Sequence, residues 1–119
     1  MEQIFDKREG MTSELTDRVL EYIHTHFSED ITLHTLAVEF FYSSGHICRV
    51  FKREMGCTFA VYLRSVRMEH AIRLLESGEY SISETACKCG YSTQAFYPIF
   101  KEYTGFTPAV ICKKTCKSK

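Results

Sequence analysis

Apolar residues recur with helical spacing along most of the chain. Leu15, Val19, Ile23 and Phe27 are spaced by four, which predicts an amphipathic helix over residues 13–27 that Ser13 caps. The same spacing predicts a short helix over residues 32–40, a third that starts after Ser43 or Ser44 and ends at Gly56, and a long one over residues 58–77. Three further helices are expected over residues 82–89, 93–105 and from Pro108 onward. The pattern therefore predicts an all-α fold of about seven helices.

Two parts of this pattern are copies of each other. The stretch YSSGHICRVFKREMG, residues 42–56, returns as YSTQAFYPIFKEYTG, residues 91–105, and an offset of 49 also aligns the short helix before each stretch without a gap. Matched pairs include Thr32/Ser81, Leu33/Ile82, Ala37/Ala86, Tyr42/Tyr91, Phe51/Phe100, Lys52/Lys101 and Gly56/Gly105. Each copy reads as a short helix, a tight turn and a capped longer helix, with a small residue where the two helices cross, which is typical of a helix-turn-helix. The alternative is a helical hairpin repeated for packing, but a solenoid needs more stacked copies than two.

The repeat sets the expected organisation of the chain. We expect a tail or linker over residues 1–11, a first helix-turn-helix subdomain over 12–57 and a linker helix over 58–77. A second subdomain is expected over 78–112, followed by a basic tail over 113–119.

Acidic and basic residues are distributed unequally along the chain, and the change falls near residue 40, just before the longer helix of the first copy. The formal net charge is zero, but residues 1–39 carry nine acidic and three basic residues, whereas residues 40–119 carry six acidic and twelve basic residues. The basic part contains both longer helices of the repeat, as nucleic-acid binding requires. No apolar run approaches the roughly 18 residues that span a bilayer, and the charged start lacks the apolar region of a secretion signal, which predicts a cytoplasmic protein.

The six cysteines do not form a recognisable metal motif. Cys87 and Cys89 point to opposite sides of a helix, and Cys112 and Cys116 could share a face, but no pair of histidines completes a ligand set. Without a secretion signal, free thiols that behave as small buried side chains are expected. No metal, cofactor or catalytic residue is therefore predicted.

Four motifs give the chain a resemblance to a known family. These are FKREMG, YLRSVRMEHAIRLL, SISETACKCGY and FKEYTGFTP, which begin at residues 51, 62, 81 and 100. Together they resemble the DNA-binding domain of the AraC/XylS, or arabinose-regulator, family of bacterial transcription factors, over about residues 15–111. The resemblance implies seven helices, two helix-turn-helix subdomains bridged by the long helix, and two recognition helices that enter successive major grooves of DNA. A linker helix of about 20 residues would span about 30 Å, close to the roughly 34 Å between successive major grooves.

The sequence departs from the family at two positions. Phe41 stands in the turn before the first recognition helix, where the family usually has glycine. Pro98 occupies the position equivalent to Arg49 in the second copy, where the family often has an arginine or another polar residue. We therefore expect the second recognition helix to be bent or shortened and to read DNA weakly, since a proline in a helix interior removes a hydrogen bond and crowds a carbonyl.

The outward faces of the two recognition helices supply the candidate DNA-binding residues. Arg49 is the predicted base reader, because its guanidinium can grip the O6 and N7 atoms of guanine, with a phosphate contact as the alternative. Gln94 could read adenine, whereas Lys52, Arg53 and Lys101 suit phosphate. Arg67 matches a recurring family arginine, which could pair with an acid such as Glu84 rather than touch DNA. The full set is Ser44, Gly45, His46, Cys48, Arg49, Lys52, Arg53, Thr93, Gln94, Ala95, Tyr97 and Lys101.

The sequence thus predicts a sequence-specific regulator that binds double-stranded promoter DNA. RNA polymerase is an optional further partner, no membrane partner is expected, and the domain alone is expected to be a monomer. A helical protein-interaction module that has lost DNA binding is the alternative. An enzyme is disfavoured, although similar domains accompany cysteine methyl acceptors in DNA repair, because the sequence shows no triad and no paired carboxylates.

Overall fold

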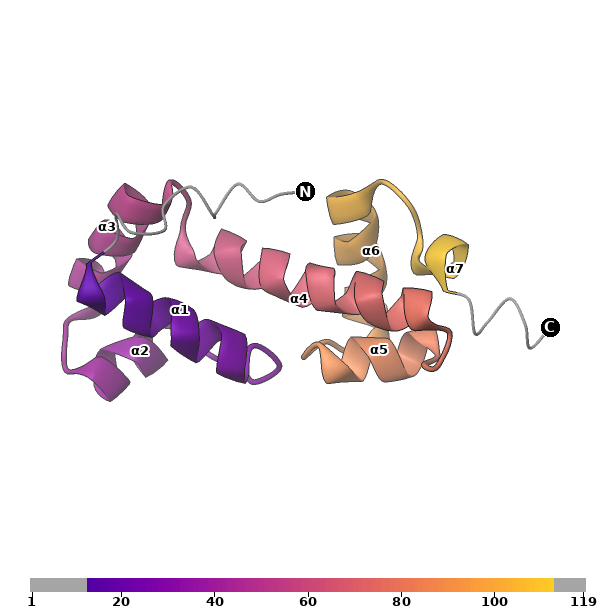
Figure 1. The fold of residues 1–119 in the computed structure, drawn as a ribbon, viewed down its shortest axis with the longest axis horizontal. Helices are drawn as coiled ribbons and strands as arrows, with labels where there is room; N and C mark the ends of the chain where they lie inside the picture. The colour runs from indigo at the N-terminus through magenta and orange to yellow at the C-terminus, as the bar shows by residue number, and fades with distance from the viewer. Residues whose placement is uncertain (1–12, 113–119) are drawn as a thin grey trace. The chain divides into compact units, whose positions relative to one another are not determined.

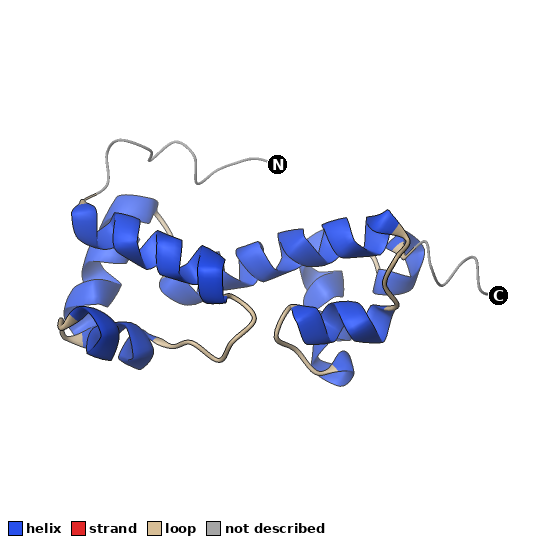
Figure 2. Cartoon of the chain, turned by 60° about the horizontal axis from the view of Figure 1, so that its bottom comes forward, coloured by secondary structure: helices blue, strands red, loops and turns tan. Residues whose placement is uncertain are grey.

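The computed structural model describes residues 13–112, and the predicted tails over 1–11 and 113–119 lie outside the described residues. The described part contains seven helices and no strand (Figures 1 and 2). They are α1 (Glu14–His26), α2 (Leu33–Phe40), α3 (Ser44–Met55), α4 (Phe59–Ser77), α5 (Ile82–Lys88), α6 (Thr93–Thr104) and α7 (Pro108–Ile111). The predicted all-α class is confirmed, and every predicted helix is present with its ends within one or two residues.

The chain divides into two compact units. Unit 1 consists of the described residues up to His26 together with Ile31–Leu63. Unit 2 consists of Phe27–Asp30, which lie between α1 and α2 in the sequence, together with the described residues from Arg64 onward. Helix α4 therefore contributes its first turn to unit 1 and the remainder to unit 2.

The core of unit 1 is built where α3 packs against both α1 and α2. Val19, Ile23, Leu36, Ile47 and Phe51 are almost fully buried there. The Phe51 ring also meets the Tyr62 ring of α4 edge to face, with centroids 5.7 Å apart, a favourable aromatic geometry. The apolar faces of α1 and α2 thus hold one face of α3 in place, and the opposite face of α3 remains exposed.

The core of unit 2 repeats this arrangement with α5, α6 and α4. Its buried residues are Met68, Ala71, Leu75, Ile82, Ala86, Cys89, Phe96, Phe100 and Cys112. The Phe96 and Phe100 rings of α6 lie with centroids 5.2 Å apart. Ala86 is fully buried, as expected for the small residue where α5 and α6 pack closely.

The two copies share their backbone hydrogen bonds as well as their sequence. The Tyr42 amide donates to the Ala37 carbonyl across 3.2 Å, and at the offset of 49 the Tyr91 amide donates to the Ala86 carbonyl across 2.9 Å. The terminal glycines Gly56 and Gly105 both have positive φ and end α3 and α6 in the same way. The sequence repeat is therefore a structural repeat of one unit: short helix, turn, capped longer helix.

The turn between the two helices of each copy contains a residue with positive φ. In unit 2 this residue is Gly90, with φ of 90°. A Cβ atom at Gly90 would lie 2.8 Å from the Ser28 carbonyl oxygen, so glycine is needed there for space as well as for torsion. In unit 1 the matching residue is Phe41, with φ of 60° and ψ of 42°, and its side chain is 91% exposed. Phe41 is the one non-glycine residue with positive φ in the described part of the chain.

Arg67 of α4 anchors the segment 27–30 within unit 2. Its Nε atom donates to the Phe27 carbonyl across 2.6 Å, and one terminal nitrogen donates to the Glu29 carbonyl across 2.8 Å. The guanidinium carbon lies 5.0 Å from the centroid of the Tyr91 ring, within cation–π distance. Phe27 stacks on His70 with centroids 4.1 Å apart. Arg67 thus acts as a structural residue that fixes a turn through its main-chain carbonyls.

Candidate nucleic-acid interface

The recognition helix of unit 1 begins with a well-formed cap. The Ser43 hydroxyl accepts from the His46 amide across 3.1 Å, and the Ser43 carbonyl accepts from the Ile47 amide. Ser43, rather than Ser44, is therefore the cap. The cap fixes the direction of the first turn, whose amides and helix dipole favour a phosphate.

The outward face of α3 carries the predicted reading residues. Gly45, Arg49, Lys52 and Arg53 are exposed, whereas Ser44, His46 and Cys48 are half-buried. Cys48 was expected to be exposed. It is partly covered, because its position on the helix lies beside the buried face that carries Ile47 and Phe51.

Two contacts shape the first turns of this face. The His46 ring stacks on the Tyr42 ring, with centroids 5.2 Å apart and an interplanar angle of 20°. A guanidinium nitrogen of Arg49 lies 3.4 Å from the place where a Cβ atom of Gly45 would be, so the arginine reaches back along the helix toward its N-terminus. Tyr42 was not among the predicted site residues. It stands four residues before His46 at the start of α3, a spacing that in a helix brings two side chains together, so the sequence could have indicated this contact.

The last turn of α3 combines exposed bases with a structural acid. Arg53 lies 3.8 Å from Glu54, and Glu54 accepts hydrogen bonds from the Ser13 amide at 2.8 Å and hydroxyl at 3.0 Å. Burial acts to raise the pKa of the Glu54 carboxyl, but the hydrogen bonds from Ser13 and Thr16 and the charge of Arg53 together hold that pKa below its usual value. Glu54 thus ties the start of α1 to α3 and leaves Lys52 and Arg53 available on the exposed side.

The recognition helix of unit 2 is as long as that of unit 1, which corrects one prediction. The Ser92 hydroxyl accepts from the Ala95 amide across 3.2 Å, and α6 runs unbroken through Pro98 to Thr104. The predicted late start or shortening is therefore wrong. Pro98 lies in the second turn of α6, and the carbonyl that its missing N–H leaves without the usual donor belongs to Gln94, an exposed residue. The bend predicted over residues 94–98 stays a prediction.

The outward face of α6 is less charged than that of α3. Gln94, Ala95, Tyr97 and Lys101 are exposed, with 39% of Tyr97 accessible. Thr93 is half-buried, and its hydroxyl lies 3.2 Å from the Ser83 hydroxyl of α5. This hydrogen bond was not predicted, since ten residues separate the partners and neither residue signals the other in the sequence. All twelve predicted residues lie on α3 or α6, seven in unit 1 and five in unit 2.

The described cysteines are free thiols. Cys87 is exposed near the end of α5, whereas Cys89, the residue after the helix, is buried. Burial raises the pKa of the Cys89 thiol to about 11, with a small opposing effect from Arg67, and burial also raises the pKa of the Cys57 thiol. Such thiols stay protonated near neutral pH and are poor nucleophiles. Cys112 is buried, and Cys116, with which it could share a helix face, lies outside the described residues.

Residues 13–112 contain neither a metal-binding cluster nor a membrane-spanning helix. No group of three or more histidine, cysteine, aspartate or glutamate side chains gathers there as a metal site would require. None of the helices in this range has the length and apolar character needed to cross a membrane.

Two capped helices with exposed basic and polar faces, each packed on a short helix through a tight turn, define the class of helix-turn-helix DNA-binding proteins. Residues 36–114 match the model of a family described as a helix-turn-helix domain. The chain is 34% identical over 102 residues to PqrA of Proteus vulgaris, a probable transcription factor, and the match covers 83% of this chain and 84% of PqrA.

The solved structures agree with the family model. The C-terminal domain of AraT, a response regulator from Geobacillus stearothermophilus, superposes with a TM-score of 0.82 at 35% identity, over 87% of this chain and 86% of that one. The DNA-binding domain of AdpA, a global transcriptional factor solved in complex with a target DNA, superposes with a TM-score of 0.78 at 28% identity, over 89% of this chain and 96% of that one. The chain belongs to the AraC family of bacterial transcription regulators, as its motifs predicted. Its family and fold are those of DNA-binding regulators rather than enzymes.

Relatives in this family differ greatly in length. The chain covers most of PqrA, but it spans only 12% of a Bacillus subtilis helix-turn-helix regulator to which it is 30% identical over 95 residues. The matched segment is therefore a module that is found both in short proteins and within long ones.

Proposed function

We propose that this chain binds duplex promoter DNA in a sequence-specific manner, with α3 and α6 in successive major grooves and α3 as the stronger reader of bases. The observation that carries the proposal is the exposed face of α3, whose other face is buried. After a capped first turn, this exposed face presents Arg49, Lys52 and Arg53. Early turns of a recognition helix reach base edges and later turns reach phosphates. The likeness to AdpA, whose domain was solved with its target DNA, supports the same use of the fold.

The difference between the two helices supports unequal reading. At matched positions α3 has Arg49 and α6 has Pro98, and only the arginine can form the bidentate contact with guanine. Gln94 and Tyr97 remain as possible base contacts on α6, and Lys101 repeats the phosphate role of Lys52. Unit 2 then contributes mainly affinity, and unit 1 contributes most of the sequence preference.

Selection of bound sequences from a random DNA pool tests this proposal. One strongly informative half-site beside a weakly informative one is expected, about one helical turn apart. Affinity should also fall linearly as the logarithm of the salt concentration rises, because bound phosphates release counterions. Two equally informative half-sites would refute unequal reading. Binding that is weak and insensitive to salt would instead favour a protein-interaction module.

The remaining parts of the proposal concern partners and place. We propose that the domain alone is a monomer in solution, that it acts in the cytoplasm beside the chromosome, and that RNA polymerase is an optional partner at the promoter. Light scattering tests the first point. A change in the mobility of the promoter complex on addition of RNA polymerase tests the last.

A further inference from the structure

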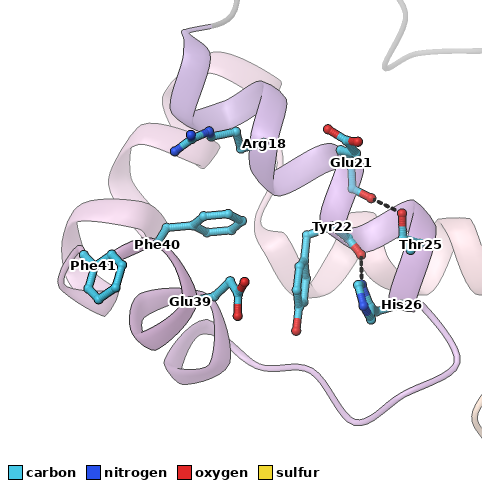
Figure 3. Close-up of a pocket in the computed structure, with 8 residues that line it drawn as sticks. All are labelled: Arg18, Glu21, Tyr22, Thr25, His26, Glu39, Phe40 and Phe41. Carbon is cyan, nitrogen blue, oxygen red and sulfur yellow. Dashed lines mark hydrogen bonds between the residues drawn. The ribbon is translucent and has the colours of Figure 1, made fainter.

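A cavity of about 560 Å³ opens between α1 and α2 in unit 1, and none of its lining residues belongs to α3. Figure 3 shows the side chains that line it, which come from α1 between Arg18 and His26, from the end of α2 and from Phe41, which follows α2. Its volume falls within the range of small-molecule pockets, which is about 300–1,000 Å³. Nothing in the proposed DNA-binding function uses these residues.

Aromatic rings form much of the wall. The Tyr22 ring of α1 meets the Phe40 ring of α2 edge to face, with centroids 5.9 Å apart. His26 stacks on Tyr22 with centroids 4.1 Å apart, and its Nδ1 atom lies 3.1 Å from the Tyr22 carbonyl oxygen. These contacts fix the position of the Tyr22 ring before any ligand arrives. The face of such a ring attracts a cation through the ring quadrupole, whereas the edge is positive and does not.

Carboxylates from both helices accompany the rings. Glu21 belongs to α1 and Glu39 to α2, and both line the cavity (Figure 3). Both are exposed, and no salt bridge holds either carboxylate within residues 13–112. Arg18 also lines the cavity, and its Nε atom lies 3.9 Å from Glu14, one turn earlier on the same helix. The lining itself thus carries two acidic side chains against one arginine. The electrostatic balance of the lining therefore favours a positive ligand.

Phe41 adds a third ring at the edge of the cavity, at a conformational cost. Its backbone lies in the left-handed region, which an aromatic residue enters at a cost of about 1–2 kcal/mol relative to glycine. The ring is 91% exposed, so it returns little of that cost through packing. The matching residue of the second copy is Gly90, which shows that the turn itself does not need a side chain. A strained and exposed ring at a cavity edge is typical of a ligand contact.

We infer that this cavity binds an organic cation, with a quaternary or tertiary ammonium group held against the Tyr22 and Phe40 rings, the Phe41 ring at the outer edge of the site, and the positive charge offset by Glu39 and Glu21. Aromatic surfaces beside carboxylates are the usual protein environment for such ligands. The site is distinct from the DNA-facing residues, so its failure would leave the proposed DNA binding intact.

A matched pair of probes tests the charge requirement on the full chain. Choline carries a quaternary ammonium, and 3,3-dimethylbutan-1-ol has the same shape with a neutral carbon in place of the nitrogen. Titration followed by amide NMR shifts should show saturable choline binding, with a dissociation constant on the order of 1–10 mM for so small a ligand. The shifts should centre on α1 and the end of α2, and the neutral probe should bind at least about threefold more weakly.

Two variants assign the interaction to residues without endangering the fold. Glu39→Gln removes one exposed charge, and choline affinity should fall about three- to tenfold. Glu76→Gln, an equally exposed acid on α4, is the control and should leave it unchanged. Phe41→Gly should weaken choline binding about threefold while the midpoint of thermal unfolding stays the same or rises, since glycine relieves the strained torsion. Phe106→Ala removes a half-exposed ring from unit 2 and should have no effect on choline.

Three results would overturn the inference. Equal affinity for the two probes would show that the cavity binds apolar groups without regard to their charge. Unchanged choline affinity in both Glu39→Gln and Phe41→Gly would place the binding elsewhere. Tighter binding of N-acetyl-lysinamide than of choline would reassign the cavity to a basic side chain of a protein partner.

Discussion

Gly90→Ala should destabilise unit 2 much more than Gly105→Ala, although the two glycines have nearly the same backbone torsion. Gly90 has φ of 90° and Gly105 has φ of 88°, and each ends a helical segment within unit 2. Alanine pays the same torsional penalty at both positions. Any difference between the two variants therefore measures the surroundings of the added methyl group.

The expected cost at Gly105 is modest. A positive φ costs alanine about 1–2 kcal/mol, and the stiffer unfolded chain returns about 0.4–1 kcal/mol. A Cβ atom at this position would have nothing within 4 Å. Gly105→Ala should thus destabilise by about 1 kcal/mol.

At Gly90 the methyl group would collide with main chain. It would lie 2.8 Å from the Ser28 carbonyl oxygen and 3.2 Å from the Ser28 carbonyl carbon. Ser28 cannot move freely, since Arg67 holds the carbonyls of the residues on both sides of it. Hydrogen bonds that involve a charged group contribute about 1.5–3 kcal/mol each, so displacing the segment should add about 2 kcal/mol to the cost.

Urea unfolding followed by far-ultraviolet circular dichroism measures both variants, provided that the slope of free energy against urea is unchanged. In an Arg67→Ala background the segment is no longer held, and the difference between the two glycine variants should shrink. Equal destabilisation by Gly90→Ala and Gly105→Ala in the unchanged background would refute the steric reasoning, and an undiminished difference in the Arg67→Ala background would refute the part assigned to Arg67.

Four further outcomes follow from the same geometry. Arg49→Ala should cost about 1–3 kcal/mol of DNA affinity and relax preference at one or two base positions, and a uniform loss across sequences would make Arg49 a phosphate contact. Lys52→Ala should weaken all sequences alike and lower the salt slope by about one in a salt titration. Folding lowers the pKa of the Glu54 carboxyl. The ionised carboxylate therefore stabilises the folded chain fully at pH values above its usual pKa of 4.5, and this stabilisation is lost as the pH falls through the lower pKa of the folded state. Glu54→Gln should therefore cost about 1 kcal/mol near pH 7 and flatten acid unfolding in that window, whereas an unchanged pH profile would contradict the assignment. Pro98→Ala should stabilise unit 2 by about 1–2 kcal/mol in urea unfolding by restoring a helical hydrogen bond to the Gln94 carbonyl, and an unchanged or lower stability would show that the helix already absorbs the proline.

Helix ends were predictable because their causes are local. Ser43, Ser81 and Ser92 each cap a helix through an amide three residues ahead, and Ser81 completes a capping box with Glu84. A hydroxyl residue before an apolar periodic run is readable in the sequence alone. The buried faces followed for the same reason, since spacing decides which side of a helix is apolar.

Contacts between distant segments were not predictable in the same way. The sequence offered an acid such as Glu84 only as one possible partner of Arg67. The structure shows Arg67 donating to the carbonyls of Phe27 and Glu29, about forty residues earlier in the chain. A main-chain carbonyl carries no residue-specific signal, so the sequence cannot name it as a partner. The shortening expected from Pro98 was wrong for a related reason, because the cost of a proline in a helix depends on the surroundings of the carbonyl left without a donor, here that of the exposed residue Gln94.

The two copies of the repeat separate what the fold requires from what it leaves free. At the turn, unit 2 keeps glycine because the Ser28 carbonyl leaves no room for a Cβ atom, whereas unit 1 carries Phe41 with its ring in solvent. On the recognition helices the buried pair Phe51 and Phe100 is unchanged. Phe41 differs from Gly90, its counterpart in the other copy, and its exposed side chain makes little packing contact. Packing therefore does not explain why a phenylalanine stands there. Binding is then the remaining explanation for the Phe41 ring, and a Phe41→Gly variant that folds equally well but loses no ligand would remove that explanation.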